Sequence, residues 1–118
     1  SHDMGDANRT ETFTYVAREL GKRGIAFICA REKEADDSLS PSLKEAFGGV
    51  FIANERFTKD QANAWLQSGK ADAVAFGIPF IANPDLPARL AQDAELNTPH
   101  PETFYGSGPV GYIDYPTL

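Results

Sequence analysis

The sequence predicts an α/β fold built on parallel strands, because short apolar runs alternate with amphipathic segments along the chain. The runs at 25–30, 50–53 and 71–76 show no polar alternation, which is typical of strands covered on both faces. The segments between them have helical spacing and are bounded by capping residues and glycines. This order of helices and strands favours right-handed parallel units whose helices cover the sheet.

In the first half of the chain, a helix is expected from Asn8 or Thr10 to about Lys22. Its apolar face consists of Phe13, Val16, Ala17 and Leu20. The strand at 25–30 follows and contains Cys29, for which a buried core position is expected. A polar loop then leads to a short helix at 41–47, with Ser40 as its cap and Pro41 in its first turn.

In the second half, Thr58 is expected to cap a helix at 59–68 that presents Ala62, Trp65 and Leu66 to the core, with Trp65 as a packing residue. After the strand at 71–76, residues 79–81 are expected to form an extra turn. Asn83 is then expected to cap the last helix, with Pro84 at its first position. The remaining chain is rich in Pro, Gly and aromatic residues, of which Tyr112 and Tyr115 are expected to anchor it.

Two architectures fit this order of elements: a flavodoxin-like sheet and a segment of a (β/α)8 barrel. Length distinguishes them, because a barrel needs eight strands and about 250 residues, whereas this chain has 118 residues. Three strands in a sheet of their own would also expose hydrogen-bonding edges. We therefore expect the remaining strands to lie outside this chain.

Composition and charge argue against several classes of function. The net charge is −6 and the pI is about 4.8, so no basic face for a nucleic acid is expected. No run approaches the roughly 18 apolar residues of a membrane span. The single cysteine, Cys29, favours a reducing, cytoplasmic location. The acidic run at 34–37 is expected to be a solvated loop rather than a metal site, and no metal is expected.

The carboxyl ends of the strands are the expected ligand site, because parallel α/β folds bind ligands there. These ends are Ala30-Arg31-Glu32, Ala53-Asn54-Glu55-Arg56 and Phe76-Gly77-Ile78, and a barrel phosphate site would fall on the last two. Gly77 would let the backbone approach an anion closely. Spacing alone leaves two interpretations open: a phosphate site made of main-chain N–H groups, and a plain strand-to-helix connection.

Four stretches of the chain form a distinctive combination of motifs. They are "ADAVAFGIPFIANPDLPARL" and the terminal "PETFYGSGPVGYIDYPTL", supported by "TFTYVARELGKRGIAFICARE" and "ERFTKDQANAWLQSGKADAVAFG". Together these motifs resemble the old yellow enzyme family, and more narrowly its xenobiotic reductase and N-ethylmaleimide reductase branch. The resemblance covers essentially the whole chain. It implies that residues 1–118 are the C-terminal part, about strands six to eight with their helices, of a flavin-binding (β/α)8 barrel.

The resemblance further implies a non-covalent FMN cofactor that NAD(P)H reduces, with an activated alkene or a nitro compound as substrate. The substrate-anchoring residues and the proton-donating tyrosine of the family belong to a strand not found in this sequence. The chain is therefore expected to be inactive alone and to need a complementary N-terminal part of the barrel.

Carried over by motif, the cofactor-binding residues are Ala53, Asn54, Glu55, Arg56, Phe76, Gly77, Ile78 and Phe104, and Tyr105 lines the substrate pocket. One departure stands out. Many relatives have an arginine where this chain has Ile78, so the phosphate would depend more on N–H donors or on Arg56. For Arg56, a phosphate ligand and a salt-bridging surface residue are both left open. The alternative function is a stand-alone α/β module that binds a phosphate or nucleotide without catalysis.

Overall fold

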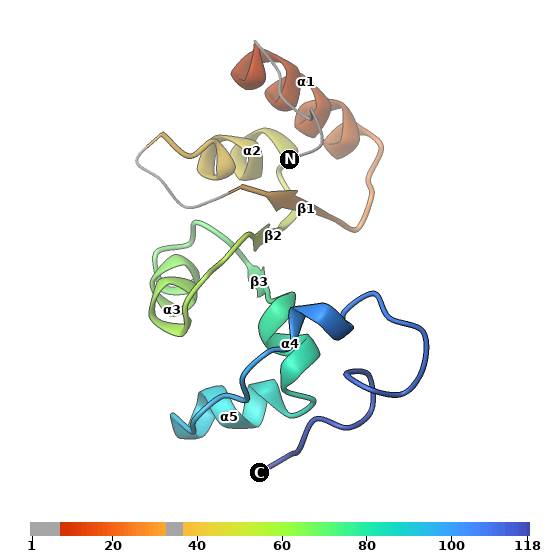
Figure 1. Cartoon of the computed structure of the whole chain (residues 1–118). Helices are drawn as coiled ribbons and strands as arrows, with labels where there is room; N and C mark the ends of the chain where they lie inside the picture. Colours follow the sequence, from red (N-terminus) through yellow and green to blue (C-terminus); the bar gives the residue numbers. More distant parts are fainter. Residues whose placement is uncertain (1–7, 33–36) are drawn as a thin grey trace. The chain divides into compact units, whose positions relative to one another are not determined.

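The structure, a computed structural model, describes residues 8–32 and 37–118 (Figure 1). It consists of two compact units, one up to Ala75 and the other from Phe76 to Leu118. The elements of the first unit are α1 (Arg9–Lys22), β1 (Phe27–Arg31), α2 (Ser40–Phe47), β2 (Val50–Asn54), α3 (Lys59–Gln67) and β3 (Ala73–Ala75). The predicted alternation of helices and strands is confirmed, and most boundaries agree within two residues.

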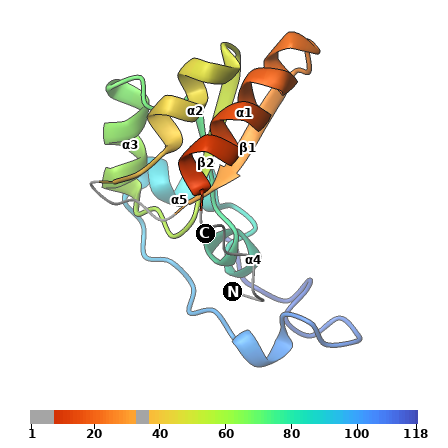
Figure 2. The ribbon, with the colours of Figure 1, turned by 90° about the horizontal axis from the view of Figure 1, so that it is seen from above.

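The strands of the first unit form one sheet in the order β1-β2-β3, and both neighbouring pairs are parallel. Arg31 pairs with Asn54, and Asn54 pairs with Ala75, so the last residues of the three strands lie in one row. Helices α1, α2 and α3 lie in that order in both views (Figures 1 and 2). The predicted parallel α/β arrangement is therefore confirmed.

The two faces of the sheet differ in burial. Phe51 and Ala53 of β2 are buried, at 0% and 1% exposure, and α2 contacts β2. Phe27 and Val50, which pair on the other face, are about half exposed, and Cys29 on that face is exposed. The predictions of strands covered on both faces and of a buried Cys29 are thus wrong for this chain. Helices α2 and α3 contact the sheet, yet the face that carries Phe27, Cys29 and Val50 stays exposed in the described residues.

Helices α1 and α2 pack closely at Gly21. A Cβ on Gly21 would overlap the carbonyl oxygen of Phe47, so the absence of a side chain allows the two backbones to approach. Ala17 is buried in this contact. Phe13 and Val16, expected on the same apolar face, remain 45% and 43% exposed, because α2 covers only part of that face.

The N-terminus of α2 is fastened by Glu32 rather than by the expected cap. Glu32 Oε1 accepts a hydrogen bond from the Leu39 N–H at 2.9 Å, and Oε2 accepts one from the Ser40 N–H at 2.9 Å. Oε2 also accepts from the hydroxyls of Ser38 and Ser40, each at 2.8 Å. Ser40 is buried and is the first residue of α2, so the prediction that it caps the helix is wrong. A carboxylate from the end of β1 satisfies the free N–H groups there instead.

Helix α3 begins as predicted. The Thr58 hydroxyl accepts a hydrogen bond from the Gln61 N–H at 3.2 Å, and the Gln61 side chain accepts one from the Thr58 N–H at 3.0 Å, which forms a capping box. Trp65 is 3% exposed and meets Phe57 edge-on at 5.0 Å, which confirms its packing role. Leu66 is 42% exposed, contrary to expectation, because it lies off the side of α3 that carries Trp65.

The second unit contains α4 (Ile78–Ala82), α5 (Leu86–Gln92) and a 3-10 turn, η1 (Pro101–Thr103). The extra turn expected at 79–81 is confirmed as α4. The prediction that Asn83 caps α5 is wrong, because Asn83 follows α4 and is fully buried. Its Nδ2 donates to the Pro79 carbonyl, and its Oδ1 accepts from the Asn97 N–H. Asp85 holds the N-cap position of α5 instead.

Several expectations concern loops and surfaces. Asp37, from the acidic run, lies 3.5 Å from the Arg9 guanidinium in an exposed ion pair, while residues 34–36 lie outside the described residues. Over residues 8–32 and 37–118, no group of three His, Cys, Asp or Glu side chains could hold a metal ion. In the same residues, no helix has both the length and the apolar character that crossing a bilayer requires.

Candidate functional site

The carboxyl edge of the sheet carries the first group of predicted site residues. Arg31, Asn54 and Ala75 end their strands in one row, and the Glu32 N–H donates to the Asn54 carbonyl at 3.0 Å. This bond extends the pairing of β1 and β2 by one residue beyond the strands. Backbone hydrogen bonds therefore hold in place the residues that carry the polar side chains after β1 and β2.

The loop after β2 has an unusual backbone. Glu55 has a φ of 115° and Arg56 a φ of 57°, values in the left-handed region that non-glycine residues rarely adopt. Each such residue costs on the order of 1–3 kcal/mol and persists where surrounding structure enforces it. Buried Phe57 and the capping box at Thr58 hold the chain directly after the loop. Strain of this kind clusters at ligand sites.

A carboxylate between two arginines occupies this loop. Glu55 Oε2 accepts from Arg31 Nε at 2.5 Å, and Glu55 Oε1 lies 3.3 Å from Arg56 Nε. The Glu55 carboxylate is 18% exposed, whereas the arginine side chains are 62% and 79% exposed. The hydrogen bond from Arg31, opposed by some desolvation, lowers the pKa of Glu55. The cluster thus holds two cations and one anion, with the cations facing solvent.

The second group of predicted site residues opens the second unit. Phe76 is half-buried, Gly77 is exposed, and Ile78 begins α4 with its side chain 53% exposed. Gly77 has a negative φ, and a Cβ there would meet no atom of the described chain within 4 Å. Neither its backbone conformation nor packing within the described residues therefore requires glycine at this position.

The aromatic residues of the tail differ in exposure. Phe104 is half-buried, and Tyr105 is fully exposed. Tyr115 bonds within the tail: its hydroxyl accepts a hydrogen bond from the His100 N–H at 2.9 Å, and its ring stacks on His100. That it ties the tail over the wall of a barrel stays a prediction. Tyr112 is 83% exposed, so the expectation that it anchors the tail is not met in the described structure.

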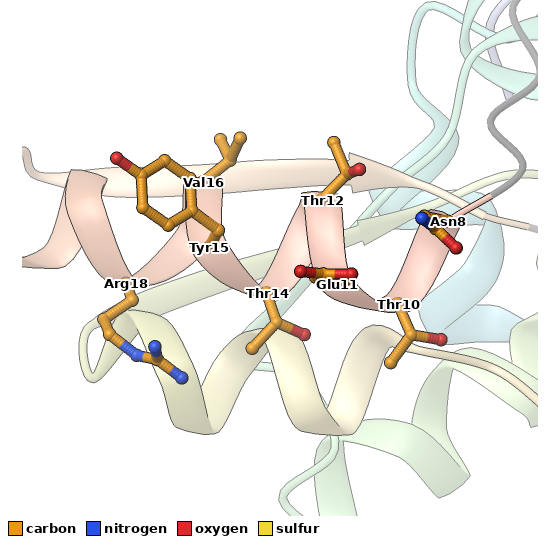
Figure 3. A pocket seen from close by; sticks show the side chains of 8 residues that line it. All are labelled: Asn8, Thr10, Glu11, Thr12, Thr14, Tyr15, Val16 and Arg18. Atoms are coloured by element: carbon orange, nitrogen blue, oxygen red, sulfur yellow. The ribbon is translucent and has the colours of Figure 1, made fainter.

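A depression of about 740 Å³ lies along α1 (Figure 3). Its lining comes from that helix and the residue before it: Asn8, Thr10, Glu11, Thr12, Thr14, Tyr15, Val16 and Arg18. No predicted site residue is among these eight. Because a single helix supplies every wall, polar groups do not converge there from different elements, as they do in ligand pockets.

Two side chains at the carboxyl edge of the sheet could hold the phosphate of a flavin mononucleotide. Arg56 supplies an exposed cation, and the Asn54 side chain supplies an amide donor. Both are donors of the type that binds a phosphate group. The second unit offers fewer free N–H groups at the start of α4, because Pro79 has no N–H and the Phe80 and Ile81 N–H groups donate to the Gly77 carbonyl at 2.9 and 3.1 Å.

Glu32 is the structural residue that sequence reasoning missed. Its side chain reaches a helix start seven and eight residues further along the chain, a spacing that differs from the local capping box. The signal available in the sequence was a glutamate directly after the β1 strand, before a helix without a capping side chain of its own.

Comparisons with known proteins define the class first. No protein-family model matches the chain. Among curated proteins, it is 40% identical over 125 residues to 12-oxophytodienoate reductase 2 of Arabidopsis thaliana. It is 37% identical over 123 residues to a Leishmania infantum protein named "Probable flavin mononucleotide-dependent alkene reductase". These alignments cover 98% and 99% of this chain but 33% of each relative, so the chain spans about a third of their length.

Solved structures that resemble this chain come from the same class of reductases. Morphinone reductase in complex with tetrahydroNAD superimposes with a TM-score of 0.89 and 42% identity, over 97% of this chain and 32% of that one. The old yellow enzyme from Trypanosoma cruzi gives a TM-score of 0.90 and 35% identity, over 98% of this chain and 32% of that one. The fold of this chain is therefore that of a portion of a (β/α)8 barrel. Over nearly its whole length the chain is therefore similar to old yellow enzymes and related reductases, of which it corresponds to about a third.

Proposed function

We propose that this chain is part of an FMN-dependent oxidoreductase that reduces activated alkenes or nitro compounds with NAD(P)H. The observation that carries the proposal is the identity of 35–42% over nearly the whole chain to reductases, one of them named as FMN-dependent. When bound, FMN would supply the hydride chemistry, and the residues of this chain would bind and orient it.

The chain would contribute about strands six to eight of a single barrel domain, as its motifs predict. Phe27 and Val50 support this placement, because a half-exposed apolar sheet face needs further structure to cover it. A complementary N-terminal part of the barrel would provide that cover, together with the substrate anchors and the proton donor. The chain alone is then expected to lack reductase activity.

The phosphate of FMN would be bound by the two segments that follow β2 and β3. Ala53, Asn54, Glu55 and Arg56 form the first segment, and Phe76, Gly77 and Ile78 form the second. Support for the first comes from the left-handed backbone at Glu55 and Arg56. Support for the second comes from the start of α4 directly after Gly77, a glycine that the described chain does not itself require.

Arg56 would take the role that Ile78 cannot fill. Its guanidinium is exposed, so solvent screens its ion pair with Glu55. A phosphate can therefore compete for Arg56 at small cost. Glu55 would remain neutralised by Arg31, so its negative charge would not repel the ligand.

Phe104 would lie beside the flavin ring, and Tyr105 would line the mouth of the substrate pocket. The full exposure of Tyr105 supports this, since an aromatic side chain without cover is available to a ligand or to the rest of a barrel.

Complementation tests the proposal. The chain is co-expressed with the N-terminal part of a related reductase, and the complex is examined by native mass spectrometry, flavin absorption and turnover of 2-cyclohexenone with NADPH. We expect a yellow, active complex, whereas the chain alone is inactive. Arg56→Gln should weaken FMN binding roughly three- to tenfold, and the matched variant Arg23→Gln, on the exposed end of α1, should leave it unchanged.

Two results would contradict the proposal. One is reduction of 2-cyclohexenone by the chain without its complement. The other is a complex that assembles but stays colourless in excess FMN. A colourless homodimer of the 12.8 kDa chain that binds inorganic phosphate would support the stand-alone module instead.

A further inference from the structure

The tail of the second unit is a loop whose two ends meet at one side chain. Arg89, on α5, donates from Nη1 to the Glu95 carbonyl at 2.6 Å and from Nη2 to the Pro116 carbonyl at 2.9 Å. Twenty residues, 96–115, separate these two carbonyls in the sequence. One guanidinium therefore closes the base of the loop at 96–115, which we call the tail loop.

Arg89 is buried, and its charge is fully engaged. The residue is 5% exposed, and its Nε donates to Asp85 Oδ1 at 2.8 Å. Asp85 Oδ2 in turn accepts from the Leu118 N–H at 2.7 Å. Hydrogen bonds from Arg89 and from Leu118 lower the pKa of Asp85. A buried charge is tolerated only when it is paired and hydrogen-bonded, so this contact needs all its acceptors in place.

A second side chain reinforces the same base. Asn97 donates from Nδ2 to the Pro116 carbonyl at 2.7 Å and to the Ala82 carbonyl at 2.8 Å. Its N–H donates to the side chain of buried Asn83. Both ends of the tail loop are thus tied to the segment formed by α4 and α5.

Apart from the bonds of Asn97, the described hydrogen bonds of the tail loop join residues within it. Within it, His100 and Tyr115 pair across the loop, and the Gly111 N–H donates to Asp114. Beyond these contacts the apolar side chains are exposed: Tyr105 at 100%, Val110 at 66%, Tyr112 at 83% and Ile113 at 73%. The direction of the loop therefore depends on its base.

We propose that Arg89 is a positioning residue that sets the direction of the tail loop and so places Phe104 and Tyr105. The roles of these two aromatics rest on the function proposed above, whereas the closure of the loop by Arg89 does not. The planar guanidinium has donors that point in different directions, so it reaches Asp85 and two carbonyls at once. A lysine ammonium in its place cannot match that geometry.

Two measurements on the 118-residue chain test the proposal without flavin. Hydrogen exchange followed by mass spectrometry reports protection of residues 96–115. Pulsed electron resonance reports the distance distribution between spin labels at Gln92→Cys on α5 and Ser107→Cys on the tail loop, in a Cys29→Ser background. Arg89→Gln should raise exchange in the loop about tenfold and widen the distribution. Arg89→Lys should restore little of either, and Arg23→Gln is the matched control in the other unit.

A truncated chain provides a second test in case Arg89→Gln does not fold. Removing residues 116–118 deletes the Pro116 carbonyl, which accepts from Arg89 and Asn97, and the Leu118 N–H, which bonds Asp85. It leaves the Arg89–Asp85 pair and α5 in the chain, and it should widen the distribution in the same way. An unchanged distribution in this truncation, or in folded Arg89→Gln, would overturn the proposal.

The flavin-loaded complex adds a readout that a loss of stability alone would not produce. There, Arg89→Gln should raise KM for 2-cyclohexenone more than it lowers kcat. An unchanged KM in a variant whose distance distribution has widened would refute the positioning role. If no flavin binds, the function proposed above is refuted. The hydrogen exchange and distance measurements then still test whether Arg89 sets the direction of the tail loop.

Discussion

Glu32 joins the end of β1 to the start of α2, and removing its charge should destabilise the first unit. In Glu32→Gln, the side chain keeps one acceptor oxygen and replaces the other with an NH₂ group. Glu32 Oε1 accepts from the Leu39 N–H, and Oε2 accepts from three donors of Ser38 and Ser40. At least one donor near the buried Ser40 therefore loses its partner.

The magnitude follows from the bonds lost. An unsatisfied buried donor costs about 1–3 kcal/mol, and loss of a helix cap costs about 0.5–2 kcal/mol. Since these describe overlapping effects, we expect Glu32→Gln to lower the free energy of unfolding by about 2 kcal/mol. With a urea slope of about 1–2 kcal/mol per molar for a small protein, the midpoint should fall by about 1–2 M.

The same residue predicts a pH dependence. Burial alone would raise the pKa of Glu32, but hydrogen bonds from Leu39, Ser38 and Ser40 outweigh it and lower the pKa below its ordinary value near 4.5. A lowered pKa in the folded state stabilises the protein above that ordinary value, and the stabilisation is lost as the pH falls through the folded-state pKa. The difference between wild type and Glu32→Gln should therefore be full at pH 7 and shrink below about pH 4.5.

Urea unfolding followed by the fluorescence of buried Trp65 measures both effects, since this tryptophan lies in the same unit. Glu45→Gln is the matched control, because Glu45 is exposed on the same helix. Equal midpoints for Glu32→Gln and wild type at pH 7 would refute the reasoning. So would a difference that stays constant from pH 7 to pH 3.5.

Two further substitutions test the packing and the capping of the first unit. Gly21→Ala should lower the free energy of unfolding by about 1–2 kcal/mol, because its Cβ would overlap the Phe47 carbonyl. This overpacking cost outweighs the gain in helix propensity. A rise in the thermal midpoint would contradict this expectation. Thr58→Ala should cost about 1 kcal/mol through loss of the capping box, and Thr58→Ser should recover most of it. Equal urea midpoints for the alanine and serine variants would show that the cap contributes nothing.

The sequence was sufficient for the elements whose signals are local. Thr58 and Gln61 stand at the spacing of a capping box, and the structure forms it. Trp65 lies at helical spacing on an apolar face, and it is buried. Pro79 within 79–81 indicated an extra turn, and α4 occupies it. In each case the energetic reason acts within a few residues of sequence, so the pattern alone reveals it.

The predictions that were wrong concern residues whose contacts come from other parts of the chain. Ser40 and Asn83 have the residue type of a helix cap. The N–H groups at the start of α2 are bonded by Glu32 instead, and Asp85 holds the N-cap position of α5. The side chains of Ser40 and Asn83 bond elsewhere. Cys29 has a core-like sequence context, but no described helix covers its face of the sheet. Partners distant in sequence decided each of these outcomes.

What the sequence by itself determined is the parallel α/β order, the location of the strand ends and the resemblance to the old yellow enzyme family. These depend on periodicity, capping signals and motifs, all of which are carried along the chain. Only the tertiary structure decided that Glu55 and Arg56 adopt left-handed backbone after Asn54, with Glu55 bonded to Arg31, and that Arg89 closes the tail loop. Backbone strain and buried charge arise from contacts between segments that folding brings together, and no local pattern encodes them.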